Sequence, residues 1–298
     1  MAMHAKTTAP FRPDNLRAIG WIMASVLGSS VMSLCVRQIS GEMDSRMIVL
    51  CRAGLIALAL LAALPFVPRW RQALRFSRPG LHLARGLAIA VSTHLGFYAL
   101  AHLELVTATV IFFSAPIFAS IFGVMFHGEG TGPRRIAAVL MGFLGVIVVL
   151  RPGFAAIEPA MFAALGSAFL FGLALGQSRK VATIDGTFSA YFSSVVITAI
   201  LSIPAALPVM SVPTTPMLLI LVLAMTATSA LRGVADILAY RHGEAMVLAP
   251  IAYTRLIFIG VGAFVFFGEV PDGTALAGAI IIIGAALYIA RRAARARI

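Results

Sequence analysis

The chain has 298 residues, of which 60% are hydrophobic and 11% are charged, whereas globular domains average about 25% charged residues. So little charge excludes an ordinary soluble domain and indicates that the whole chain lies in a lipid bilayer. The net charge of +12 would favour a nucleic-acid partner in a soluble protein, but basic loop residues set the orientation of a membrane protein, so we expect no nucleic acid.

Ten apolar segments are long enough to span a membrane as helices. These spans are expected at about 16–40, 46–64, 81–102, 105–127, 133–150, 159–181, 187–207, 216–240, 245–267 and 272–290. The predicted fold class is therefore an all-α integral membrane protein. Cys35 and Cys51 fall inside apolar segments and are expected to be small packing residues. The first segment lacks a convincing cleavage site after it and is expected to be retained.

The distribution of basic residues predicts the orientation of the chain. With ten spans both termini lie on one side, and the loops of that side hold 16 basic residues against three on the other side. Because basic loops stay in the cytoplasm, residues 1–15 and 292–298 are expected to be cytoplasmic tails. The expected location is the inner (cytoplasmic) membrane.

One stretch occurs twice. Glu104–Glu129 returns 140 residues later as Glu244–Glu269, without a gap and with seven of 26 positions identical. Residues 16–150 and 156–291 would then be two copies of a five-helix unit. Because five is odd, the second copy enters the membrane from the opposite face, which predicts two inverted repeats around a central site. The glutamates that frame each copy are expected to cap helices or sit in turns.

Several motifs resemble the drug/metabolite transporter superfamily, in particular its ten-helix EamA-type members. They are Tyr98-Ala-Leu, Glu104, Ala115-Pro116, Gly128-Glu129 and the run from Gly142 to Gly153. The resemblance covers about residues 15–292 and implies a transporter of amino acids, nucleotide-like metabolites, vitamins or toxic organic compounds, by proton coupling or exchange. The second half departs from the pattern, because Arg255-Leu256 stands where the first half has Ala115-Pro116.

Charged residues within spans are costly and are functional candidates. Arg255 lies nearest the middle of a span, and we expect it, with Tyr253 beside it, to hold an anionic group of the substrate through a bidentate contact. The alternative is that Arg255 stabilises the bundle. Asp236 is the only acidic residue well inside a span, and Arg232 precedes it by one helical turn. The two form either a structural ion pair or a proton-coupling site.

Further candidates for substrate binding are Arg52, Arg85, His94 and Tyr98. Arg52 and Arg85 resemble arginines seen in the corresponding helices of the family, although Arg85 is near a helix end and could reach the interface. His94 is either a hydrogen-bonded packing residue or part of a proton relay. Pro116 and Pro250 interrupt their helices, which predicts hinges.

The predicted function is a secondary transporter of small anionic or zwitterionic metabolites, working by alternating access on a proton gradient or by exchange. The alternatives are a flippase of lipid-linked substrates and a non-transporting sensor or assembly subunit. The sequence has no cluster with metal-ligand spacing and no phosphate-binding loop, so we expect no metal, no cofactor and no enzymatic activity. The spans at 133–150 and 272–290 are poor in polar residues and could serve as a scaffold or as the face of a homodimer.

Overall fold

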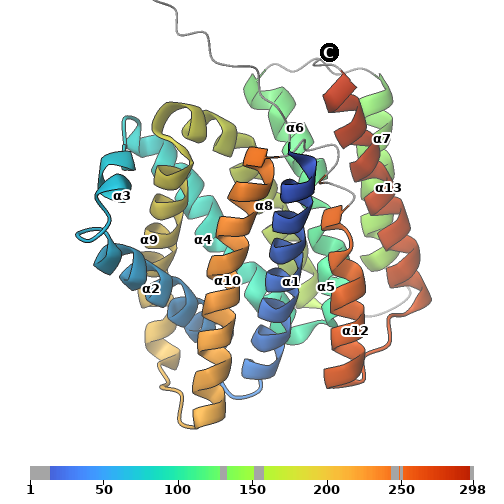
Figure 1. The fold of residues 1–298 in the computed structure, drawn as a ribbon. Coiled ribbons are helices and arrows are strands. Elements are labelled where there is room, and N and C mark those ends of the chain that lie inside the picture. Colours follow the sequence, from blue (N-terminus) through green and yellow to red (C-terminus); the bar gives the residue numbers. More distant parts are fainter. Residues whose placement is uncertain (1–13, 128–132, 151–157, 243–247, 249–250, 296–298) are drawn as a thin grey trace, which may run out of the picture.

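The apolar segments fold into helices, because a helix satisfies its own backbone hydrogen bonds where no water is present. The computed structural model describes residues 14–127, 133–150, 158–242, 248 and 251–295, and these residues contain no strand (Figure 1). The expected helical membrane fold is confirmed. The helices are α1 (Asn15–Ile39), α2 (Ser45–Ala63), α3 (Pro68–Ala73), α4 (Pro79–His102), α5 (Leu105–Phe112), α6 (Ala115–His127), α7 (Pro133–Leu150), α8 (Pro159–Asp185), α9 (Thr187–Ala206), α10 (Pro216–His242), α12 (Arg255–Phe267) and α13 (Gly273–Arg295), with a 3₁₀ turn at Leu207–Val209.

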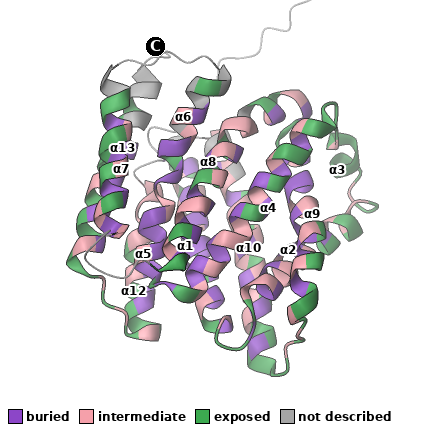
Figure 2. Cartoon of the chain, turned by 180° about the vertical axis from the view of Figure 1, so that it is seen from behind, coloured by how far each residue is buried: buried purple, intermediate pink, exposed green. Residues whose placement is uncertain are grey.

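The outer surface of the bundle is apolar. Six of the described helices are long and apolar enough to cross a membrane, and shorter apolar helices accompany them. Large side chains such as Leu58, Phe266 and Ile280 point outwards and are 64%, 70% and 75% exposed. Figure 2 shows this exposed surface around a buried interior. Water would make such a surface unfavourable, whereas lipid makes it the expected one.

The helices pack in pairs that follow the sequence repeat. If the second half repeats the first, α8 corresponds to α1 and α10 to α4. The two closest-packed pairs are α1 with α10 and α4 with α8. Under this correspondence the two pairs are equivalent, because each joins the first helix of one half to the third span of the other. The pairs α2 with α9 and α7 with α13 each join an element to its own counterpart. The start of α1 and the end of α13 lie at the same end of the bundle (Figure 1), as an even number of spans requires.

Two spans that we expected as single helices, each kinked at a proline, are divided by a turn. The expected helix 105–127 is divided into α5 and α6 by a turn at Phe113–Ser114, and the expected helix 245–267 has a turn at Tyr253–Thr254 directly before α12. The two turns are 140 residues apart, which is the offset of the sequence repeat. Each half thus contains one discontinuous helix, a feature typical of transporters.

A shared hydroxyl, rather than a shared proline, marks the two turns. Ser114 Oγ and Thr254 Oγ1 each donate to the carbonyl oxygen three residues earlier, that of Ile111 and that of Ile251, at 2.6 Å. Such bonds compete with the helical pattern. Pro116 is the second residue of α6, where its missing N–H is tolerated, and Pro250 lies outside the described residues. That Pro116 and Pro250 act as hinges stays a prediction.

Glycine allows α8 to approach α6 closely. A Cβ atom on Gly172 would come within 2.7 Å of Phe118 Cβ and 2.8 Å of the Ala115 carbonyl oxygen. We predict that Gly172→Val lowers the free energy of unfolding by about 1–3 kcal/mol, the usual cost of overpacking. Thermal unfolding in detergent should show this loss. Gly20→Ala is the matched control, because nothing lies within 4 Å of its added atom, and equal destabilisation by both variants would contradict the prediction.

Candidate functional site

The two discontinuous helices meet at their turns. The rings of Phe113 and Tyr253, which are 140 positions apart, pack edge to face with centroids 4.9 Å apart. Helices α5 and α12 are also in contact. The middle of the bundle is thus formed by equivalent residues of the two halves, and Arg255 follows directly as the first residue of α12.

Arg255 occupies a position that helix stability does not explain. A positive charge at a helix N-terminus opposes the helix dipole. Its Nη2 donates to Ser33 Oγ on α1 at 2.9 Å, while its Nε is buried and has no hydrogen-bond partner among the described residues. A guanidinium has five N–H donors, so Arg255 retains capacity for a further acceptor.

Arg52 shows the same pattern from α2. Its Nη1 donates to Ser229 Oγ on α10 at 2.9 Å, and its guanidinium carbon lies 5.1 Å from the centre of the Phe97 ring on α4. Its Nε is also buried without a partner in the described part of the chain. Ser229 and Phe97 thus position the guanidinium without neutralising its charge.

Arg232 and Asp236 form the pair expected one turn apart on α10. Arg232 Nε lies 3.7 Å from Asp236 Oδ2, and the two side chains are 33% and 38% exposed. Asp236 Oδ1 also accepts a hydrogen bond from Ser25 Oγ on α1. Asp236 therefore links α10 to α1, and the side chains of Arg232 and Asp236 both remain partly exposed rather than buried in the core.

These residues form one electrostatic group, which we call the central charge cluster: Arg52, Arg232, Asp236 and Arg255. Arg232 lies close enough to repel both Arg52 and Arg255, and Asp236 attracts Arg255. Three positive side chains and one negative one leave a formal charge of 3 − 1 = +2. Such a centre favours an incoming negative group.

Sequence reasoning missed Tyr191 on α9 as a neighbour of this cluster. Its ring packs against α10 where Gly233 leaves room, since a Cβ there would lie 3.0 Å from the Tyr191 hydroxyl oxygen. Tyr191 also interacts electrostatically with Arg52 and Arg232. The glycine beside Arg232 was the available signal, but a glycine in a span usually serves helix packing.

The remaining candidates have partners elsewhere. Arg85 joins α4 to α8 and α9, because Nε donates to Ser178 Oγ at 2.8 Å and Nη1 donates to the Ala190 carbonyl oxygen at 2.8 Å and to Ser194 Oγ. His94 Nε2 lies 2.9 Å from Ser202 Oγ, and the Tyr98 ring packs on His102 with centroids 4.1 Å apart. These contacts hold Arg85 between three helices, and its role in substrate binding stays a prediction.

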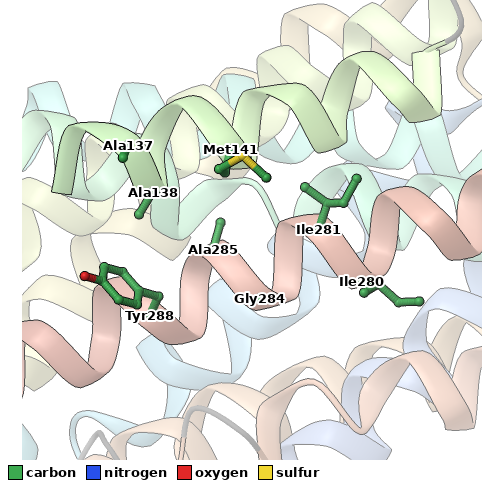
Figure 3. A pocket seen from close by; sticks show the side chains of 8 residues that line it. All are labelled: Ala137, Ala138, Met141, Ile280, Ile281, Gly284, Ala285 and Tyr288. Atoms are coloured by element: carbon green, nitrogen blue, oxygen red, sulfur yellow. The ribbon is translucent and has the colours of Figure 1, made fainter. Parts of the chain in front are cut away.

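A separate groove lies between α7 and α13 and has a volume of about 440 Å³. Figure 3 shows its lining, in which Met141 faces Ile281 and Ala285 across the groove and Tyr288 lies at one end. None of its lining residues is charged, so the groove suits hydrocarbon rather than a polar solute. A homodimer through this face stays a prediction.

A helical membrane bundle with paired discontinuous helices and a charged centre is a feature of membrane transporters. Residues 16–151 match the model of the EamA-like transporter family. The S-adenosylmethionine uptake transporter of Rickettsia bellii is 30% identical over 272 residues, which cover 91% of this chain and 92% of that protein. The chain belongs to the EamA-like transporter family and is a multi-pass membrane transporter of small molecules.

Other relatives carry different names. The pseudopaline exporter CntI of Pseudomonas aeruginosa is 28% identical over 91% of this chain and 95% of that protein. The riboflavin transporter of Rhizobium johnstonii is 30% identical over 80% of this chain and 79% of that protein. A solved crystal structure has the same fold, with a TM-score of 0.64 at 20% identity over 93% of this chain and 98% of that one.

Proposed function

We propose that the protein carries small anionic or zwitterionic metabolites across the inner membrane, with both termini in the cytoplasm. The observation that supports this most directly is the pair of buried guanidiniums, Arg52 and Arg255, each with a buried Nε that lacks a partner among the described residues. A buried donor without a partner costs free energy, and a carboxylate or phosphate would satisfy both. The cluster's formal charge of +2 supports the same sign of ligand.

The name of one relative points to a substrate that carries the charged groups of this proposal. S-adenosylmethionine, the substrate named for the Rickettsia bellii relative, has an α-carboxylate beside an α-ammonium group. In this proposal the carboxylate binds Arg255 and Arg52, while the ammonium lies near Asp236. Tyr253 and Tyr191 would offer ring surfaces and hydroxyls to the rest of the ligand. Other amino-acid-like metabolites would use the same contacts.

Transport would proceed by alternating access between the two halves. The turns at Phe113–Ser114 and Tyr253–Thr254 are equivalent in sequence and lie against each other, so they are suited to be hinges, with Pro116 and Pro250 nearby. Half-helices that end at a central site are a recurrent way to expose it to either side. The driving force would be a proton gradient, with Asp236 and Arg232 as the coupling pair, or exchange of solutes.

The test is uptake of a mixed metabolite pool by proteoliposomes, read by mass spectrometry, with and without an imposed pH gradient. We expect enrichment of carboxylates or zwitterions and no enrichment of purely cationic or neutral solutes. Enrichment of neutral solutes alone would contradict the proposed substrate class. A folded protein that moves no soluble metabolite would instead favour the flippase or the non-transporting sensor.

A further inference from the structure

An ion pair between the two halves closes the end of the bundle that lies opposite the start of α1. Arg37 is in the last turn of α1, and Glu269 follows α12. Arg37 Nη2 lies 3.3 Å from Glu269 Oε1, and the side chains are 27% and 11% exposed. The distance is that of an ion pair, although Oε1 lacks a partner in hydrogen-bond geometry. A largely buried carboxylate held by a cation is costly to separate from it.

Both partners also hold the backbone of other helices. Arg37 Nη1 donates to the carbonyl oxygen of Ala101 on α4 at 2.6 Å, and Glu269 Oε2 accepts from the backbone N–H of Leu105 at 2.8 Å. Leu105 is the first residue of α5, whose N-cap Glu104 forms no side-chain capping bond. The expected cap at Glu104 was therefore wrong, and a glutamate of the other half replaces it.

The local turn explains how Glu269 reaches α5. Gly268 ends α12 with φ +68°, a left-handed conformation that glycine adopts without strain. The chain thereby reverses, and the next residue points its carboxylate back to the bundle. Arg37 and Glu269 together join α1, α4, α5 and α12 at one end. Helices α5 and α12 are the two half-helices on that side of the central turns.

The repeat position of Arg37 in the second half holds a neutral residue. The position 140 residues after Arg37 is Gln177 on α8, which is neutral. Gln177 Oε1 is buried without a hydrogen-bond partner among the described residues. Glu129, the repeat partner of Glu269, lies outside the described residues. The arginine of one half thus has a neutral counterpart in the other.

We propose that Arg37 and Glu269 form a latch that keeps the non-cytoplasmic end closed, so that its separation admits substrate from that side. This inference rests on the proposed alternating access. Removing either charge should shift the population towards the state that is open to the outside, because the closed state loses interactions that the open state does not have. Transport from outside would then begin at lower substrate concentration.

The chain contains a natural reporter of this opening. Its two cysteines are Cys35 and Cys51, and Cys35 lies two residues before Arg37 with 6% exposure. In a Cys51→Ala background, the rate of labelling of Cys35 by a membrane-impermeant maleimide is measured from each side of oriented vesicles. We expect Arg37→Gln and Glu269→Gln to accelerate labelling from the non-cytoplasmic side by about tenfold, a shift that a loss of 1.4 kcal/mol produces.

Two variants complete the design. Arg46→Gln removes an arginine at the same end, whose partner Asp44 lies 2.9 Å away on the same helix cap, and it should leave labelling unchanged. Arg37→Lys keeps the charge and should restore slow labelling. Unchanged labelling in both Arg37→Gln and Glu269→Gln, with each variant shown to be folded by gel filtration, would overturn the latch. So would acceleration from the cytoplasmic side alone.

The readout separates the latch from the transported substrate. Labelling of Cys35 needs no substrate, so accelerated labelling without any uptake of anions would support the latch and contradict the proposed function. Uptake of anions together with Cys35 labelling that neither substitution accelerates would support the proposed function and contradict the latch.

Discussion

Replacing Arg255 with alanine is expected to raise the substrate concentration for half-maximal uptake by roughly 10- to 100-fold, because a hydrogen bond to a charged group contributes about 1.5–3 kcal/mol. Arg255 lies at the turn where the two discontinuous helices meet and donates to Ser33 Oγ, while its Nε is buried and has no hydrogen-bond partner among the residues that the structure describes. Loss of a donor that binds the anion should raise the substrate concentration for half-maximal uptake more than it lowers the maximal rate of uptake. Uptake kinetics in proteoliposomes measure the effect.

Arg255→Lys separates charge from geometry. Lysine keeps the positive charge but lacks the planar fork that binds a carboxylate through two bonds. We expect an intermediate affinity, between those of the wild type and Arg255→Ala. Arg46→Ala, at an exposed pair with Asp44, is the control and should transport normally. Affinity that is the same in wild type, Arg255→Lys and Arg255→Ala would leave Arg255 a purely structural residue.

The second large effect is expected from Asp236→Asn. An amide cannot exchange a proton with the solvent, so uptake driven by a pH gradient should be lost, while exchange of labelled for unlabelled substrate across the same membrane should persist. The exposure of Asp236, at 38%, and its contacts with Arg232 and Ser25 place it where partners could change during transport. Parallel measurements of gradient-driven uptake and of exchange in Asp236→Asn test this expectation.

A purely structural ion pair makes a different prediction. In that case Asp236→Asn would leave Arg232 uncompensated, and removing its charge as well, in Asp236→Asn with Arg232→Gln, should restore stability together with gradient-driven uptake. Proton coupling at Asp236 predicts that the double variant regains stability but not coupling. Coupling that survives in the single variant would exclude Asp236 as the proton site.

Much of the fold could be predicted because membrane helices are specified by length and hydropathy. The spans α1, α2, α4 and α7 to α10 begin and end within a few residues of their expected positions. The turns at Phe113 and Tyr253 could not be predicted in this way, since length and hydropathy do not show where a span is divided. The repeat contained the hint that was missed, which is a hydroxyl residue at the same position of both halves, Ser114 and Thr254.

The candidate site was predictable in composition but not in arrangement. The cost of placing charge in a membrane singled out Arg52, Arg232, Asp236 and Arg255 without any structure. The sequence placed Arg85 near a helix end, but it could not show that the partners of Arg85 are serines and a backbone carbonyl from two distant helices. The capping of α5 by Glu269 was equally hidden, since it depends on a contact between residues 164 positions apart.

The most direct test of the central claim is a double-mutant cycle on binding. The metabolite that proteoliposomes enrich is compared with its carboxyl amide, which lacks the negative charge, and both are titrated calorimetrically into wild-type protein and Arg255→Ala. If the carboxylate binds Arg255, the amide should bind the wild type at least about tenfold more weakly, and this difference should nearly vanish in the variant. A discrimination that is equally large in Arg255→Ala would show that the carboxylate is recognised elsewhere and would contradict the account.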